Sequence, residues 1–360
     1  MVRWRSGTVS SVRRRWQGAL EMDVSTPDGP LRALAYPALT GEPLPGDRVL
    51  LNVGALAMGL GTGGYALVVA LPDRLPADPP SDATTRAAGH LVKARYTPLQ
   101  PILLGVDEEA SPHRDVMAAA VSLDGMPVVT ADLHSALPAI LAGVRADRPA
   151  ARVAYVMTDG GALPAWFSRT LDGLRDHLAG TITTGQSFGG DLEAGTVHTG
   201  LLAARHVLGA DVTIVTQGPG NLGTGTAWGF SGVSVGEAVN AVATLEGQPI
   251  GSLRISSGDA RPRHRGVSHH SLTAYGKVAL LRADLVIPEG LAPDLAADVD
   301  AALRPLAARH RLVLVPVDRL DEALRASPVP LSTMGRDLDA DRAYFLAAAA
   351  AGRHAASLLA

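Results

Sequence analysis

The chain has 360 residues, of which 47% are hydrophobic, 19% are charged and 4% are aromatic. This hydrophobic fraction supports a large buried core and excludes wholesale disorder. The 32 basic and 35 acidic side chains give a net charge of −3, so neither nucleic acid nor an anionic membrane surface is an expected partner. Cysteine is absent, which excludes disulfides, thiol nucleophiles and thiolate metal ligands.

Residues 1–73 predict a small β-barrel-like domain. Apolar and β-branched residues are concentrated in short runs, and turn sequences such as TPDGP and GEPLPGD separate these runs. The runs that we interpret as strands are GTVSSV, ALEMDVS, RALAY and DRVLLNV.

Residues 49–72 contain no charged residue and are numerous enough to span a bilayer. Glycines and Asn52 interrupt this stretch, so we interpret it as a strand, a glycine loop and a second strand. The N-terminus lacks the apolar core of a signal peptide. We therefore expect a cytoplasmic protein with no membrane segment.

Residues 74–89 are rich in proline and aspartate and predict an exposed linker. From residue 90 to residue 360, strand-like apolar runs alternate with helical patterns. This alternation predicts an α/β domain, in which helices cover both faces of a mostly parallel sheet. The expected strands are 127–131, 152–157, 181–184, 211–217, 250–256 and 311–317, and the expected helices lie near 135–146, 162–178, 192–208, 235–246, 271–283 and 319–326.

An alanine-rich closing helix is expected at the C-terminus. Such a helix suits close packing against a neighbouring element, and a homodimer is one candidate assembly.

Four loops follow expected strands and are unusually rich in glycine, carboxylate, arginine and histidine. Ligands of open parallel sheets bind beyond the carboxyl ends of the strands. We therefore expect these loops to meet along one edge of the sheet and to form one site. The four loops are TDGGALP, GQSFGGDLEAG, GPGNLGTGTAWGFSGVSVG and SGDARPRHRGVSHHS.

The glycine-rich loops are candidates for binding an anion through backbone N–H groups. The GxGxxG pattern at 218–223 does not favour a dinucleotide site, because no helical pattern begins before about residue 235. The alternative is close backbone packing, which glycine also permits. The candidate ligand-binding residues are Gly218, Gly220, Asn221, Gly223, Thr224, Gly225, Gly189 and Gly190.

Residues 185–189 match the GxSxG pattern of a serine nucleophile between a strand and a helix. In this hypothesis Ser187 is the nucleophile, an aspartate at 211 or 259 is the acid, and a later histidine is the base. The alternative is an ordinary turn.

The fourth loop combines three histidines with arginines. We expect His264, His269 and His270 to transfer protons or to contribute to a divalent metal site. The adjacent His269 and His270 would point about 100° apart on a helix, so only one of them is expected to bind the metal, with Asp159, Asp191 or His134 as further candidate ligands. Arg263 and Arg265, with Arg261 nearby, would neutralise an anion.

Asp159 and Asp191 are candidate residues for orienting a histidine or holding a metal ion. Turn formation and a favourable contact with a helix N-terminus would explain the two carboxylates equally well.

The chain resembles, over most of its length, an uncharacterised bacterial family that is defined as a domain of unknown function. The resemblance rests on the segments GTGGYALVVA, GHLVKARYTPLQ, YVMTDGGALP, FGGDLEA, GPGNLGTGTAWGFSG and RPRHRGVSHHSLTA. It supports the loops as a set and implies no activity.

The leading hypothesis is an enzyme that acts on a small anionic molecule, phosphorylated or nucleotide-like. The glycine loop would hold the anion, the histidines would act as acid or base, and a divalent metal is a candidate cofactor. The first alternative is a non-catalytic metabolite-binding or scaffold protein, and the second is a serine hydrolase that uses Ser187.

Overall fold

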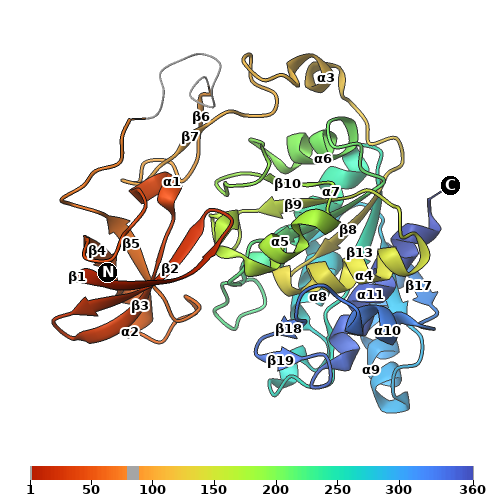
Figure 1. Ribbon diagram of the computed structural model, residues 1–360. Coiled ribbons are helices and arrows are strands. Elements are labelled where there is room, and N and C mark those ends of the chain that lie inside the picture. The colour runs from red at the N-terminus through yellow and green to blue at the C-terminus, as the bar shows by residue number, and fades with distance from the viewer. Residues whose placement is uncertain (1, 79–88, 360) are drawn as a thin grey trace. The chain divides into compact units, whose positions relative to one another are not determined.

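The computed structural model describes residues 2–78 and 89–359 (Figure 1). The chain folds into two compact units. Unit 1 comprises Met1–Leu104 and Trp166–Asp172, and unit 2 comprises Gly105–Ala165 and Gly173–Ala360. Unit 1 is therefore larger than the predicted domain 1–73. Residues 79–88 of the predicted linker lie outside the described residues.

Unit 1 is built on a closed five-stranded barrel, as predicted. The strand order is β1-β2-β3-β5-β4, and an antiparallel pairing of β1 with β4 closes the barrel. Its core consists of inward-facing aliphatic side chains such as Val9, Met22 and Leu51. The elements of unit 1 are β1 Trp4–Trp16, β2 Ala19–Thr26, β3 Gly29–Ala35, α1 Pro37–Thr40, β4 Arg48–Asn52, α2 Gly54–Ala57, β5 Ala66–Ala70, β6 Leu91–Val92 and β7 Ile102–Leu103.

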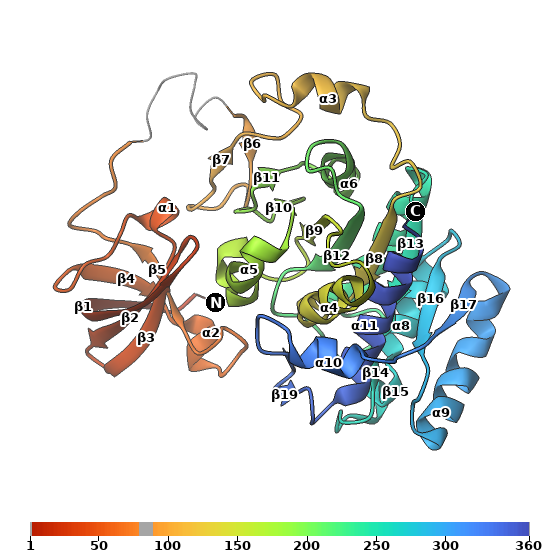
Figure 2. The same ribbon diagram turned by 45° about the vertical axis from the view of Figure 1, so that its right-hand side comes forward.

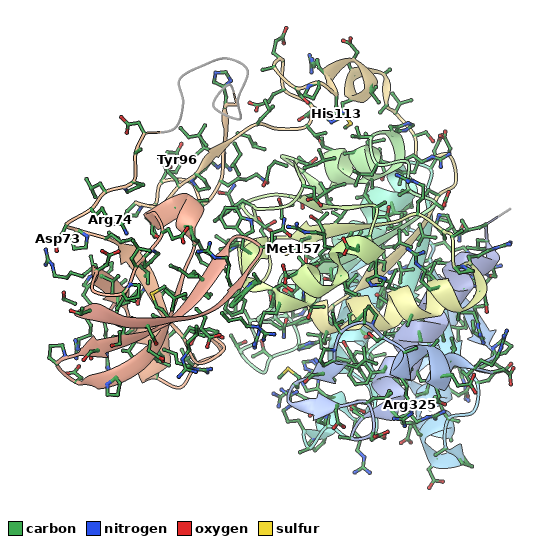
Figure 3. The ribbon with its side chains drawn as sticks, in the orientation of Figure 1. Asp73, Arg74, Tyr96, His113, Met157 and Arg325 are labelled. Atoms are coloured by element: carbon green, nitrogen blue, oxygen red, sulfur yellow. The ribbon has the colours of Figure 1, made fainter. Side chains whose placement is uncertain are left out.

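Residues 49–72 form β4, the short helix α2, a glycine loop and β5. This agrees with the predicted strand, loop and strand. No helix in the described part of the chain is long and apolar enough to cross a membrane. Just after β5, Asp73 and Arg74 form ion pairs with Arg48 and Asp47 on the barrel surface (Figure 3).

Segment 166–172 belongs to unit 1 because it binds the turn between β1 and β2. The Trp16 indole Nε1 donates to the Trp166 carbonyl at 2.7 Å, and the Gln17 amide donates to Asp172 Oδ1 at 2.9 Å. A Cβ at Gly18 would lie 2.2 Å from the Trp166 ring, so the turn requires glycine. Nothing local in the sequence indicates this long-range pairing.

Unit 2 is an α/β unit with an eight-stranded parallel sheet, which confirms the predicted fold class. The strand order is β11-β10-β9-β12-β8-β13-β16-β17. Its strands are β8 Pro127–Ala131, β9 Val153–Thr158, β10 Gly180–Thr183, β11 Leu192–Glu193, β12 Val212–Gln217, β13 Gln248–Ser252, β16 Asp284–Pro288 and β17 Arg311–Val315.

Helices cover both faces of this sheet (Figures 1 and 2). In the sheet, the connection from β8 through α4 to β9 and the connection from β12 through α7 to β13 run in opposite directions. Because parallel connections of this kind are right-handed, α4 and α7 lie on opposite faces, and α11 packs against α4. The helices are α3 Arg114–Ala119, α4 Leu137–Asp147, α5 Arg169–Leu174, α6 Val197–His206, α7 Ser234–Thr244, α8 His269–Thr273, α9 Pro293–Leu303, α10 Leu320–Arg325 and α11 Arg342–Ser357.

The alanine-rich closing helix α11 packs inside unit 2 rather than presenting its alanines to solvent. It crosses α4 so closely that a Cβ at Gly352 would lie 2.0 Å from the Ile140 carbonyl oxygen. A Cβ at Gly143 would likewise lie 1.9 Å from the Ala349 carbonyl oxygen. Glycines and alanines therefore bring the two backbones together.

Several predicted boundaries differ from the structure. The predicted helix at 162–178 is α5 flanked by 3₁₀ turns, and the one at 192–208 begins only at Val197. The start of the latter is strand β11, where Glu193 accepts a hydrogen bond from Thr183. The predicted strand 250–256 divides into β13 and β14 (Ile255–Ser256), which pairs with β15 (Gly266–Val267). The predicted helix at 271–283 is α8 followed by a π turn at 274–278. The sequence patterns did not predict β16, α9 or the two-stranded pair of β18 (Ser332–Thr333) and β19 (Arg336–Asp337).

Candidate functional site

The candidate site lies where the chain leaves β8, β12 and β13, three neighbours in the sheet. The connection after β8 leads to α4, on the same face as α11, and the connection after β12 leads to α7 on the opposite face. Adjacent strands whose connections diverge in this way open a crevice at their carboxyl ends. Asp132 directly follows β8, and Arg254 follows β13 by two residues.

Three imidazoles gather at this crevice. Candidate ligand atoms of His264, His269 and His270 all lie within 4.8 Å of one another. The centroid of the His269 ring is 4.4 Å from that of His270 and 4.9 Å from that of His264. The structure thus brings the three histidines of the fourth loop together, including the adjacent His269 and His270, which the sequence predicts to diverge on a helix.

Ser268 contacts the ring of His264 and the backbone of His270. Its hydroxyl lies 2.8 Å from His264 Nδ1 and accepts the His270 amide at 3.2 Å, which caps the N-terminus of α8. A serine at this position is typical of a helix N-cap. Because Nδ1 of His264 is engaged, Nε2 is the atom of that ring left to bind a ligand.

Buried polar atoms without hydrogen bonds surround the imidazole cluster. His269 Nε2, His270 Nδ1 and Asp132 Oδ2 have no hydrogen-bond partner among the described residues. Asp132 Oδ2 is 3.6 Å from His270 Nδ1. An unsatisfied buried polar atom costs about 1–3 kcal/mol, so a bound ion or a water molecule at these atoms would be favourable.

A balanced ionic network surrounds the histidines. The buried Arg254 lies 3.9 Å from Asp132 Oδ2 and 3.2 Å from Asp259 Oδ2. Asp259 also pairs with Arg261 and Arg336. Hydrogen bonds from Arg261 hold the pKa of the Asp259 carboxyl well below its usual range. Arg336 in turn pairs with Asp341, so three arginines face three aspartates and the charges cancel.

The pKa values of two imidazoles beside this network, those of His264 and His269, are shifted toward the neutral form. Burial, reinforced by Arg254 and Arg261, lowers the pKa of His264 to about 3. Burial and the neighbouring His270 ring lower the pKa of His269. Neutral imidazoles are the form that binds a metal ion or accepts a proton.

The glycine loop meets the histidine loop at two points. The Phe230 ring stacks on His270 with centroids 3.8 Å apart and planes at 1°. A Cβ at Gly225 would lie 3.9 Å from the Arg263 guanidinium. Arg263 and Arg265 are exposed and have no ion pair among the residues that the structure describes, so both can receive an anion.

The glycine loop is a hairpin-like turn and not a helix N-terminus. The Thr224 amide donates to Gly229 O, and Gly223 forms an antiparallel bridge with Phe230. Gly220 and Gly225 have positive φ, which favours glycine. Asn221 accepts hydrogen bonds from Gln217 Nε2 and Ser231 Oγ and so holds the turn.

Gly218 serves close packing. A Cβ there would lie 2.4 Å from the Ala162 carbonyl oxygen. Of the predicted glycine-loop residues, those near Gly225 face Arg263, whereas Gly218 and Asn221 support the loop from within.

The second loop binds mainly to itself. The amides of Gly189 and Gly190 donate to Glu193 and Thr183. Asp191 accepts the Thr181 amide and hydroxyl at 2.8 Å. The predicted roles of Gly189, Gly190 and Asp191 in the histidine site therefore have no support from these contacts.

Asp159 and His134 are also engaged in structural contacts. Asp159 accepts the Gln186 amide at 2.8 Å. His134 Nδ1 lies 2.9 Å from the Tyr155 hydroxyl, and burial lowers the pKa of His134 to about 4.

Ser187 does not present its hydroxyl as a nucleophile would. The residue is fully buried, and its Oγ donates to the carbonyl oxygens of Met157 and Thr184. A nucleophilic serine needs an accessible Oγ beside a base, so this geometry disfavours the hydrolase hypothesis.

Sequence reasoning missed Asp132, Arg254 and Phe230. Asp132 follows directly after the expected strand 127–131. The expectation that ligands bind beyond the carboxyl ends of strands, which located the other loops, therefore applies to Asp132 as well. The buried Arg254 and the ring of Phe230 carry no local signal of their positions.

The fold and site define an α/β protein with a separate barrel unit and a three-histidine centre at the carboxyl ends of its central strands. The chain belongs to the family described as a protein of unknown function, DUF3866, whose family model matches residues 32–352. No curated protein matches the chain.

Proposed function

We propose that this protein is an enzyme that acts on a small phosphorylated or carboxylated molecule with a divalent cation held by His264, His269, His270 and Asp132. The observation that carries the proposal is the convergence of three imidazoles, together with the Asp132 carboxylate that lies 3.6 Å from His270 Nδ1; His269 Nε2, His270 Nδ1 and Asp132 Oδ2 are buried and have no hydrogen-bond partner among the described residues. Imidazole and carboxylate together are ligands that zinc and related ions prefer.

The donor set fits such an ion with modest side-chain movement. Zinc–nitrogen distances are about 2.0–2.1 Å, so nitrogens around a tetrahedral ion lie roughly 3.4 Å apart. The candidate atoms of the three histidines lie within 4.8 Å of one another, so the side chains must rotate to bring these atoms closer around an ion. The three arginines of the ionic network are paired with three aspartates, which limits their repulsion of the ion.

The bound cation would polarise a phosphoryl or carbonyl oxygen. The chain's own residues then have distinct tasks. Arg263, beside the tip of the glycine loop, holds the anionic group of the substrate. Ser268 and Phe230 fix the orientation of the imidazoles.

Metal binding is tested by titrating chelator-treated protein with Co²⁺ and Zn²⁺ and following the visible Co²⁺ spectrum. We expect one ion per chain. The His269→Ala and His270→Ala variants should bind at least tenfold more weakly, since even second-shell groups contribute about 10–100-fold. His198→Ala, which alters an exposed histidine on α6, is the matched control.

Ser268→Ala separates positioning from helix stability. Loss of the cap costs about 1 kcal/mol, and we also expect about 10-fold weaker metal binding. Thr196→Ala removes an equivalent N-cap from α6 and should lower stability without changing metal affinity. Equal metal affinity in both variants would contradict the role of Ser268.

Catalysis is tested by incubating the metal-loaded protein with a panel of nucleotides and sugar phosphates and detecting products by mass spectrometry. Turnover that Arg263→Gln weakens supports the proposal. Metal binding without turnover would favour the metabolite-binding alternative. Absence of metal binding in the wild-type protein would refute the proposed centre.

A further inference from the structure

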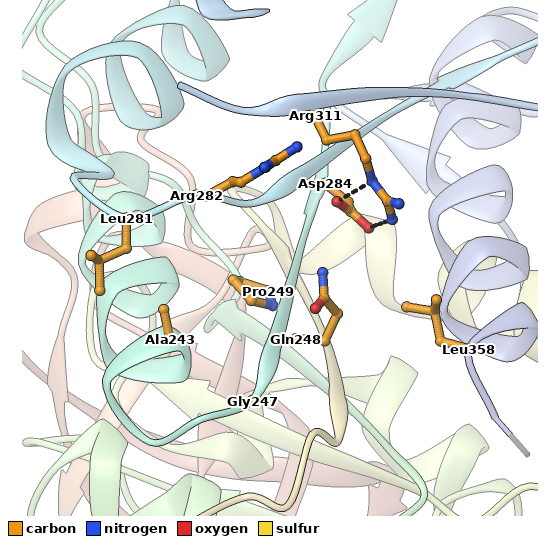
Figure 4. Close-up of a pocket in the computed structure, with 9 residues that line it drawn as sticks. All are labelled: Ala243, Gly247, Gln248, Pro249, Leu281, Arg282, Asp284, Arg311 and Leu358. Atoms are coloured by element: carbon orange, nitrogen blue, oxygen red, sulfur yellow. Dashed lines mark hydrogen bonds and ion pairs between the residues drawn. The ribbon is translucent and has the colours of Figure 1, made fainter. Parts of the chain in front are cut away.

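A cavity lies at the amino ends of the sheet strands, on the side opposite the histidine centre. Its volume is about 700 Å³. It opens at the amino ends of β13, β16 and β17, whose first residues are Gln248, Asp284 and Arg311. The histidine centre lies beyond the carboxyl ends of the strands, so the two sites are distinct. The cavity is lined by Ala243, Gly247, Gln248, Pro249, Leu281, Arg282, Asp284, Arg311 and Leu358 (Figure 4).

A buried carboxylate anchors the polar side of this cavity. Asp284 is 3% exposed. It accepts hydrogen bonds from Arg311 Nε at 2.7 Å and from His354 Nε2 at 2.8 Å. Burial opposes ionisation, but these two bonds lower the pKa of Asp284 to about 2. The carboxylate is therefore charged at neutral pH and holds the Arg311 guanidinium at the cavity wall.

The cavity carries surplus positive charge. Asp284 shares its single negative charge with Arg311 and His354. Arg282 is exposed and has no hydrogen bond or ion pair within the described residues. Two guanidinium groups thus face one carboxylate, and an anion entering the cavity would restore the balance.

The apolar residues that line the rest of the cavity suit the apolar part of a ligand. Ala243, Pro249, Leu281 and Leu358 line the cavity, and Leu281 and Leu358 are 42% and 40% exposed. Figure 4 shows the Gln248 amide directed toward the Asp284–Arg311 pair. The volume lies within the range of about 300–1,000 Å³ that small-molecule sites occupy.

We propose that this cavity binds a small molecule with one anionic group on an apolar body. The anionic group lies between Arg282 and Arg311, and the body contacts Leu281, Pro249 and Leu358. Guanidinium forks bind carboxylate and phosphate alike, so the headgroup is either of these.

Ligand-observed NMR with the metal-free, full-length protein tests this site. Phenyl phosphate and benzoate present the two headgroups on the same ring, and benzyl alcohol is the uncharged control. We expect both anions to bind and the alcohol to bind at least tenfold more weakly. The stronger of the two anions identifies the headgroup.

Variants locate the bound anion. Arg282→Gln should weaken anion binding about tenfold, which is the loss of one charge-assisted hydrogen bond. Because Arg282 is exposed and makes no ion pair, this change should leave the fold intact. Arg304→Gln, which alters an exposed arginine in the 3₁₀ turn that follows α9, is the matched control and should bind as the wild type does.

Two results would overturn the proposal. One is equal binding of benzyl alcohol and the anions. The other is anion binding that the Arg282→Gln variant leaves unchanged. If His269→Ala abolishes that binding instead, the anion binds at the histidine centre. Failure of this cavity to bind anions leaves the metal titration of the histidine centre unaffected, so the two proposals fail separately.

Discussion

Asp132 and Arg254 place opposite charges at the ends of two neighbouring strands, β8 and β13. Asp132 faces the imidazole of His270, whereas Arg254 links Asp132 to Asp259. Pairing with Arg254 offsets part of the desolvation cost of burying these carboxylates, because the attraction between opposite charges is strong in a buried place. At the level of single residues, the site combines a carboxylate held by Arg254 with two rings, His264 and His269, whose pKa values lie below the usual range.

His134 is a buried titratable residue outside the imidazole cluster, and it predicts a pH-dependent stability. Its folded pKa of about 4 lies below the unfolded value of 6.5. The unfolded chain therefore takes up a proton first as the pH falls. Stability should be complete above pH 6.5 and should decrease by about 3 kcal/mol as the pH falls toward 4.

Denaturant unfolding at pH 7 and at successive steps down to pH 4 measures this effect. His134→Gln keeps a polar side chain near Tyr155 but cannot titrate, so the difference between the two stability profiles isolates His134. Parallel profiles for the wild type and the variant would show that this residue does not couple protonation to folding.

At the scale of elements, the sequence predicts types better than boundaries. The strand-and-helix alternation and the barrel both follow from local patterns, since burial on both faces produces continuous apolar strands. β16 was missed because DLVIP is short and follows a charged turn. The early end of the predicted helix at 271–283 reflects a π turn, which depends on packing against α7 and leaves no local mark.

In the candidate site, too, the local sequence predicts some features and not others. His264, His269 and His270 are close in sequence, so their grouping was predictable. Asp191 seemed equivalent from its place after a strand, but the chain turns back and Asp191 binds Thr181 at the start of β10. Local sequence does not encode this return, because it depends on the pairing of β11 with β10.

The crossing of α4 and α11 gives a prediction for a whole element. In an unconstrained helix, alanine is about 1 kcal/mol more favourable than glycine. Gly352→Ala should instead destabilise the protein by about 1–3 kcal/mol, because its Cβ would meet the Ile140 backbone.

Chemical denaturation of Gly352→Ala measures this change, with Gly195→Ala as the control. A Cβ at Gly195 would have no neighbour within 4 Å, so that variant should change stability by less than about 0.5 kcal/mol. A stabilising Gly352→Ala substitution would show that the two helices are not held in this close crossing.

At the scale of the whole molecule, each unit has its own hydrophobic core. The barrel core of unit 1 includes Leu20 and Met22, and the sheet core of unit 2 includes Val128 and Val156. The proposed metal site belongs entirely to unit 2. A ligand stabilises the folded unit that binds it, so zinc should act on one unit and not on the other.

Tryptophan positions make this difference measurable. Trp4, Trp16 and Trp166 lie in unit 1, and Trp228 is the one tryptophan of unit 2. In a Trp228→Phe variant all tryptophan emission therefore comes from unit 1. Far-UV circular dichroism reports mainly on helices. Among the described residues, every helix of six or more residues except α5 lies in unit 2, so this signal reports mainly on unit 2.

Thermal unfolding of the Trp228→Phe variant should separate the two units. Zinc at 100 times its dissociation constant contributes about 2.7 kcal/mol, which corresponds to about 5–10 °C for a unit of this size. The midpoint from circular dichroism should rise by this amount, while the fluorescence midpoint stays constant. Adding His269→Ala should remove the rise. A shift of equal size in both signals, or one that persists without His269, would mean that zinc does not act through the histidine centre of unit 2.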